Sequence, residues 1–123
     1  MNMTIFTADT AGVAKNCLYP NRAEITNTQE LAEALSKDHT CGEFKGNYRS
    51  ISNFIGSGVI AMDFDNTESE DSKDWVTPQK IAEMMPDVAM AIAPSRNNMK
   101  PKDGKAPRPK GHVYFDFDPI NSL

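Results

Sequence analysis

Four short apolar segments of the chain predict β-strands: 3–7 (MTIFT), 58–64 (GVIAMDF), 87–93 (DVAMAIA) and 111–117 (GHVYFDF). The last alternates between polar and apolar residues, as expected of a strand whose side chains point to opposite faces in turn. By contrast, 87–93 is apolar without interruption after its first residue, which predicts a strand buried on both faces.

Capping signals predict two helices. Asn27 is a good N-cap, and Glu30 follows it at the spacing of a capping box, so a helix is expected over 28–38. Thr77 is a second N-cap, and the proline after it suits the first turn of a helix, which is expected over 78–85.

The order of these elements predicts an α/β fold. Strand 58–64, the second helix and strand 87–93 form a βαβ unit, whose strands are expected to run parallel with a right-handed crossover. Four prolines within 94–109 prevent regular structure there, and strand 111–117 then returns beside the other two. We therefore expect one domain over 1–123, with an N-terminal portion (1–57) and a strand–helix–strand–loop–strand portion (58–123) that carries the motifs.

Charge is distributed unevenly along the 123 residues, although the net charge is only -4. Segment 95–110 holds six basic residues and one acid, and we call it the basic loop. Segment 63–74 holds six acids and one lysine. A polyanion that binds together with a divalent cation suits both segments.

The cellular compartment is predicted from the absence of membrane-span and secretory-signal features in the sequence. No apolar run approaches the ~20 residues of a membrane span, and the first ten residues lack the features of a secretory signal, so no membrane partner is expected. Cys17 and Cys41 show no CxxC spacing, which indicates free thiols in a reducing, cytoplasmic protein. His39 and Cys41 have the spacing of half a zinc site, but no second half is visible.

The strongest chemical signal is the pair Asp63 and Asp65 at the end of a predicted central strand. Side chains two residues apart project from the same side of a strand, and two adjacent carboxylates repel each other unless a proton or cation neutralises them. The carboxyl end of a strand is also where open α/β sheets bind ligands. His112 lies on the strand after the basic loop and shares a face with Tyr114 and Asp116 by alternation.

One family interpretation is a haloacid-dehalogenase phosphatase, because Asp63, Asp65 and Thr67 match its DxDxT motif. Asp63 would then attack a phosphoryl group and Asp65 would act as general acid and base. The sequence after Thr67 departs from that family, since an acidic, polar run follows where an apolar residue is expected.

A second resemblance covers most of the chain. The segment YRSISNF (48–54), the motif VIAMDFDN (59–66) and the stretch from DWVTPQK (74–80) to GHVYF (111–115) together resemble the N-terminal part of the archaeo-eukaryotic primases, in the primase-polymerase form of phages and mobile elements. In this resemblance, Ser95 opens and His112 closes the second motif of the family.

The resemblance implies a primase/RRM-like core and metal-dependent, templated nucleotidyl transfer in DNA replication. Its partners would be nucleoside triphosphates and a single-stranded DNA template, and its cofactor Mg²⁺ or Mn²⁺. Asp63 and Asp65 would hold the metal, and His112 would contact the triphosphate. The residues implied around the phosphates are Ser95, Arg96, Arg108 and Lys110.

The third motif of the family is a further acid after the histidine strand. Asp116 and Asp118 are the only acidic residues after His112, so we expect a primase domain whose C-terminal part is missing from this chain. The alternative is a catalytically incomplete, primase-like protein that binds or inhibits a host nucleic-acid enzyme, such as a CRISPR nuclease. The dehalogenase-type phosphatase is the third candidate.

Overall fold

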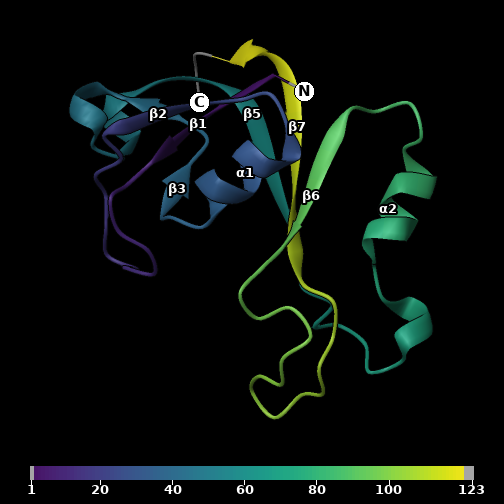
Figure 1. Ribbon diagram of the computed structural model, residues 1–123. Coiled ribbons are helices and arrows are strands. Elements are labelled where there is room, and N and C mark those ends of the chain that lie inside the picture. The colour runs from purple at the N-terminus through teal and green to yellow at the C-terminus, as the bar shows by residue number, and fades with distance from the viewer. Residues whose placement is uncertain (1, 121–123) are drawn as a thin grey trace. The chain divides into compact units, whose positions relative to one another are not determined.

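A computed structural model describes residues 2–120, and their side chains as far as Phe117. It confirms the predicted α/β class, with two small antiparallel sheets and two α-helices (Figure 1). The elements, in chain order, are β1 (Met3–Thr7), β2 (Asn21–Ile25), α1 (Thr28–Leu35), β3 (His39–Thr40), β4 (Glu43–Phe44), β5 (Phe54–Phe64), α2 (Pro78–Met84), β6 (Met90–Pro94) and β7 (Gly111–Ile120).

The chain divides into two compact units. Unit 1 comprises the residues up to Ile60 together with the chain from Asp116 onward, and unit 2 comprises Ala61–Phe115. The long strands β5 and β7 contribute residues to both units. None of the helices within residues 2–120 is long and apolar enough to cross a lipid bilayer.

Unit 1 is built on the antiparallel sheet β2-β1-β3, with α1 in contact with β1 and β2. The core includes Ile5 and Ile25, both at most 2% exposed, and Leu31 of α1. Strand β2 was not predicted, because its outward residues are charged. Arg22 and Glu24 lie on that outward side and form an ion pair of 2.8 Å.

Helix α1 begins as predicted, since the Asn27 side chain accepts a hydrogen bond from the Glu30 amide at 2.9 Å. It ends at Leu35, three residues earlier than the predicted Asp38. The Asp38 carboxylate accepts hydrogen bonds from the amides of Gly12 (2.7 Å) and Val13 (3.0 Å). Asp38 therefore stabilises the neighbouring loop and does not extend the helix.

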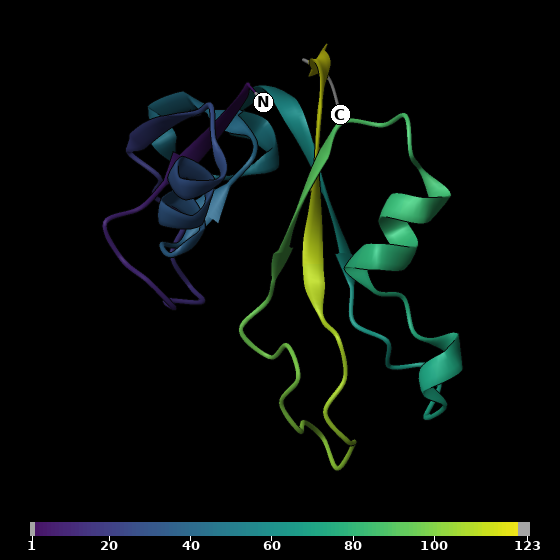
Figure 2. The ribbon, with the colours of Figure 1, turned by 45° about the vertical axis from the view of Figure 1, so that its right-hand side comes forward.

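The second sheet has the order β4-β5-β7-β6, so the returning strand β7 lies between β5 and β6 (Figure 2). Strand β7 is antiparallel to β6, with Pro94 opposite Gly111. It is also antiparallel to β5, since Gly58 lies near the Phe117 carbonyl whereas Phe64 lies against Gly111. Strands β5 and β6 therefore run parallel, as predicted, but they are not hydrogen-bonded neighbours.

The apolar segment 87–93 forms a shorter and less buried strand than predicted. Strand β6 begins only at Met90, because the Val88 amide donates to the Met85 carbonyl (3.2 Å) in a turn. Only Ala91 of this strand is buried. The prediction of burial on both faces was wrong because β6 is an edge strand, which packs less completely than a central one.

Both described cysteines are free thiols. Burial raises the pKa of the Cys41 thiol to about 11, so this side chain keeps its proton at neutral pH. Because metals bind the thiolate, burial disfavours Cys41 as a zinc ligand. The Nδ1 atom of His39, the other half of the suggested zinc pair, lies 2.8 Å from the Lys37 carbonyl oxygen.

Gly111 of β7 lies in close contact with β6 and with Phe64 of β5. A Cβ atom there would lie 2.5 Å from the Ala93 carbonyl oxygen and 2.8 Å from the Phe64 ring. We predict that Gly111→Ala lowers the free energy of unfolding by about 1–3 kcal/mol, because the backbone must move to relieve this overlap. Urea denaturation measures the change.

Gly58→Ala is the matched control, since its Cβ would meet only the Phe117 carbonyl oxygen at an ordinary 3.7 Å. Equal stability of the two variants would show that β5, β6 and β7 are not packed this closely at Gly111.

Candidate active site

The ends of β5 and β7 in unit 2 bring together two of the predicted site residues. His112 Nε2 lies 2.9 Å from Asp63 Oδ1, in an ion pair when the imidazole is protonated. Both side chains reach solvent, with 36% of His112 and 76% of Asp63 exposed. The rings of His112 and Tyr114 lie 6.1 Å apart, which is consistent with their predicted position on one face of β7.

Asp65 follows at the point where β5 ends, and the next residue turns the chain. Asn66 has a φ of 55°, in the left-handed region that asparagine tolerates better than most residues. Its side-chain amide donates to the carbonyls of Val76 and Pro109, both at 2.8 Å, and its Oδ1 accepts from the Val76 amide at 2.7 Å. Asn66 therefore holds the base of the acidic loop, which we define as residues 67–75, and joins it to the basic loop.

The basic loop continues the β6–β7 hairpin. The Ser95 amide donates to the Lys110 carbonyl at 3.0 Å, and the Asn98 side chain accepts from the Lys110 amide at 2.9 Å. At its tip, Asp103 and Gly104 both have positive φ, at 52° and 74°. Two consecutive residues with positive φ are typical of a tight hairpin turn, for which Asp-Gly is a favoured pair.

These elements enclose a pocket of about 280 Å³. Five of the seven predicted site residues line it: Asp63, Asp65, Ser95, Lys110 and His112. The exposed Arg96 is not among its lining residues. Thr67, the last residue of the DxDxT match, also lines the pocket, as do Asn97, Lys102 and Asp103, which were not predicted as site residues. The Asp-Gly pair is the sequence signal for the turn that presents Lys102.

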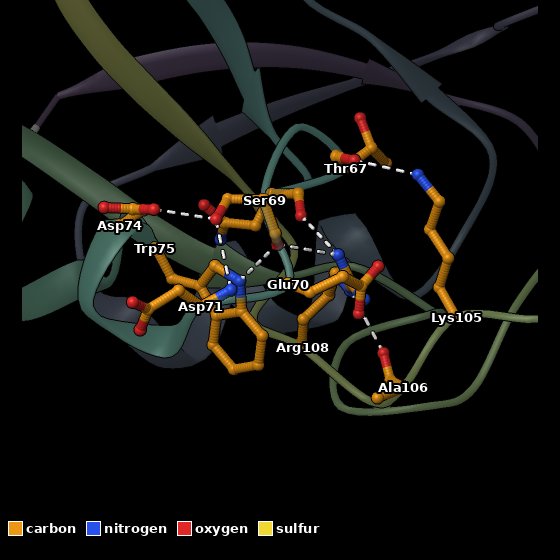
Figure 3. Close-up of polar contacts among 10 residues, drawn as sticks. Thr67, Ser69, Glu70, Asp71, Asp74, Trp75, Lys105, Ala106 and Arg108 are labelled. Carbon is orange, nitrogen blue, oxygen red and sulfur yellow. Dashed lines mark hydrogen bonds and ion pairs between the residues drawn. The ribbon is translucent and has the colours of Figure 1, made fainter.

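Arg108 lies elsewhere than the resemblance implied. It is 1% exposed and does not line the pocket. Its guanidinium donates to the carbonyls of Asn66 (2.9 Å) and Ser69 (3.1 Å) and pairs with Glu70 Oε2 at 2.8 Å (Figure 3). It also lies 5.5 Å from the centre of the Trp75 ring. Arg108 therefore links the basic loop to the acidic loop.

Other side chains of the acidic loop form contacts within it (Figure 3). The Asp74 carboxylate accepts from the Ser69 hydroxyl at 2.7 Å, as Figure 3 shows for this pair. The Asp71 carboxylate accepts from the Lys73 amide at 3.0 Å. From the basic loop, Lys105 donates to the Thr67 carbonyl at 2.8 Å. The pocket is thus lined by Asp63 and Asp65 but by no carboxylate of the acidic loop.

The donor set around Asp63 and Asp65 suits a hard divalent cation. Mg²⁺ is commonly held by one or two carboxylates and completes its shell with water and substrate phosphates. Within residues 2–120, as far as side chains are described, no group of three or more histidine, cysteine or acidic side chains is placed to hold a metal. Asp116, considered for the third acidic motif, is an exposed residue of unit 1, and the Asp118 side chain lies outside the described residues.

No protein-family model, curated protein or solved structure matches the chain significantly. The resemblance to primases therefore stays a prediction from the motifs.

The Arg108 contacts generate a stability prediction. Arg108→Met removes the donors to three carbonyls, those of Asn66, Ser69 and Ala106, and should lower the free energy of unfolding by about 3 kcal/mol. Glu70→Gln should cost less than about 1 kcal/mol, because 67% of the Glu70 side chain is exposed and solvent screens the pair.

Chemical denaturation measures both values, and Trp75 provides a local signal because it is the chain's only tryptophan. In Arg108→Met the tryptophan emission should shift to longer wavelength as the ring loses its cover, while Glu70→Gln keeps the parent spectrum. If the two variants lose the same stability, the ion pair and not the carbonyl contacts dominates.

Proposed function

We propose that unit 2 binds a nucleoside triphosphate together with Mg²⁺ or Mn²⁺ and transfers its nucleotide to a growing strand, as a primase-polymerase does. The observation that carries this proposal is the pocket whose lining includes Asp63, Asp65 and His112 together with Lys102 and Lys110. Carboxylates for a metal and cations for phosphates are the two requirements of phosphoryl chemistry, and both line one cavity.

Each side chain has a distinct task in this proposal. A cation held by Asp63 and Asp65 would neutralise phosphate oxygens and polarise the reacting phosphorus. His112 Nε2 contacts Asp63 in the structure, so its single N–H would have to leave Asp63 to donate to a phosphate oxygen when Asp63 holds the metal. Lys102 and Lys110 would stabilise the negative charge that develops on the leaving pyrophosphate.

The charges of the pocket predict that nucleotide binding depends on the metal. Three carboxylates line it (Asp63, Asp65 and Asp103) against two lysines, Lys102 and Lys110. When His112 is neutral, a bare triphosphate would meet a net negative lining, whereas a divalent cation between the aspartates would reverse the balance locally. The nucleotide and metal should therefore bind cooperatively.

A second candidate function follows from the small number of carboxylates. Asp103 lines the same pocket, but among the described side chains no three acidic, histidine or cysteine groups are placed to hold a metal together, so the site suits binding better than two-metal catalysis. A primase-like protein that binds without transferring, and acts on a host nucleic-acid enzyme, is consistent with this arrangement. Incorporation of labelled nucleotide on a primed template distinguishes transfer from binding alone.

The central prediction concerns the aspartates. The double variant Asp63→Asn, Asp65→Asn should weaken binding of dGTP in the presence of Mn²⁺ by at least about 100-fold, since changing groups that merely support metal ligands already costs 10–100-fold. Calorimetry with and without Mn²⁺ measures this effect.

The double variant Asp71→Asn, Asp74→Asn is the matched control, because it makes the same charge change in the acidic loop and both amides can still accept the loop's hydrogen bonds. Equal losses in the two double variants would refute a specific metal site. A beryllium fluoride adduct on Asp63, which mimics an aspartyl-phosphate, would instead assign a phosphatase.

A further inference from the structure

Strand β6 combines an apolar sequence with a position at the edge of a sheet. Among the residues that the structure describes, the sheet β4-β5-β7-β6 ends at β6, which pairs with β7 on one side (Figure 2). Natural edge strands commonly carry a lysine or another charged residue that prevents pairing with a further chain. Segment 88–93 (VAMAIA) has no charged or polar side chain. The strand therefore lacks side chains that would keep another strand away from its open edge.

Contacts with β7 show which backbone groups of β6 face that strand. The Ser95 amide, directly after β6, donates to the Lys110 carbonyl at 3.0 Å. The Ala93 carbonyl oxygen would lie 2.5 Å from a Cβ atom at Gly111 of β7, so it also points toward β7. In an antiparallel ladder, the amide and carbonyl of one residue point to the same side, and successive residues alternate. Ala91, Ala93 and Ser95 therefore direct their backbone groups toward β7.

The residues between them face the open edge. By the same alternation, the amides and carbonyls of Met90 and Ile92 point away from β7. Pro94 has this orientation too, but it offers only a carbonyl because proline has no N–H. The side chains of Met90 and Ile92 are apolar and half-buried. The open edge thus presents backbone donors and acceptors with apolar side chains beside them, which an added strand can pair with.

This edge is complementary to itself. When two copies are related by a two-fold axis through Ala91, their β6 strands run antiparallel and Met90 of each copy lies opposite Ile92 of the other. Both residues have outward backbone groups, so each such pair exchanges its main-chain hydrogen bonds in both directions, and the apolar side chains meet. A two-fold axis one residue away, at Ile92, would instead set Met90 against Pro94, which cannot return a hydrogen bond.

The charges at the two ends of the strand also favour a second copy. Asp87 precedes β6 and Arg96 follows it, and both are exposed. Antiparallel pairing about Ala91 brings the acidic end of each strand to the basic end of the other, which is favourable at both ends. A parallel arrangement would place like charges together.

The opposite edge of the same sheet is a weaker candidate. Strand β4 already pairs with Phe54 and Gly56 of β5. The Ser57 hydroxyl accepts from the Val59 amide at 3.2 Å and donates to the Val59 carbonyl at 2.8 Å. Farther along, Asp63 is 76% exposed, and a charge on an edge strand disfavours pairing with a second copy. Strand β6 itself carries no charge.

We propose that two copies of this chain associate through β6, as antiparallel strands with Ala91 on the two-fold axis, and so join their sheets into one. A strand added to a sheet edge gains affinity mainly from main-chain hydrogen bonds. The contact is small compared with the interfaces of stable dimers, so we expect weak, reversible association. The proposal does not depend on the nucleotide site, because none of the residues that line that pocket takes part in the pairing.

Amide exchange with solvent, followed by NMR at increasing protein concentration, tests the orientation and the pairing together. In dilute protein the amides of Met90 and Ile92 should exchange quickly, while those of Ala91 and Ala93 are protected by β7. When most chains are dimeric, exchange at Met90 and Ile92 should slow by at least about threefold, because it then occurs only through the remaining monomer. The amide of Glu68 in the acidic loop is the control and should keep its rate.

Sedimentation velocity of Met90→Lys provides the second test. An ammonium group at the open edge would have to be buried against the partner strand, so self-association should weaken at least about tenfold. Met84→Lys is the matched control, since it makes the same change at the end of α2, where the methionine is 74% exposed. Its association should stay within about twofold of the parent. Circular dichroism and urea denaturation establish that both variants are folded.

The proposal is overturned if the parent stays monomeric at every concentration, which would leave the edge to a different protein, or if the amides of Met90 and Ile92 are already protected in the monomer. Association without slower exchange at these amides would place the interface elsewhere and overturn it too. So would equal association of Met90→Lys and the parent. If Met90→Lys does not fold, the exchange measurement on the parent decides alone.

Discussion

The candidate active site depends on one buried cation. Arg108 connects the basic loop to the acidic loop through the carbonyls of Asn66 and Ser69, and Trp75 packs against its guanidinium. A guanidinium can satisfy several carbonyl acceptors at once because its five donors are fixed in one plane. Desolvating this charge is costly, and hydrogen bonds to neutral carbonyls together with the partly exposed Glu70 offset the cost. The two loops are therefore organised before any ligand arrives.

The charged side chains of the two loops are divided between the pocket lining and contacts that stabilise the fold. The acidic loop has several carboxylates, but Asp71 and Asp74 accept hydrogen bonds from groups of the same loop. The basic loop contributes Lys102 and Lys110 to the pocket lining and directs Arg108 into the protein. Opposite charges that are close in sequence thus serve two purposes, since some stabilise the fold and others line the cavity.

Local sequence patterns predicted the fold class, the helix starts and the proximity of the two motif-bearing strands. Alternation located the strand that contains His112, and the paired aspartates marked the end of β5. Strand β2 was missed because its exposed side is charged, and segment 87–93 was judged more buried than an edge strand can be. Arg108 could not be predicted as a buried residue, because its partners are about 40 positions away and charge alone suggests exposure.

The contact between Asp63 and His112 has a consequence for how this chain can vary. It exists only in one register of β5 against β7, and neighbouring side chains of a strand face opposite ways. A single residue inserted or deleted inside either strand would turn the carboxylates away from the imidazole while leaving composition and motifs nearly intact. The tip of the basic loop lies beyond the contact between Ser95 and Lys110, so a change in its length would keep this register but would move Lys102, which lines the pocket. Length changes within the strands would therefore separate Asp63 from His112, whereas length changes at the hairpin tip would alter the part of the pocket lining that the loop contributes.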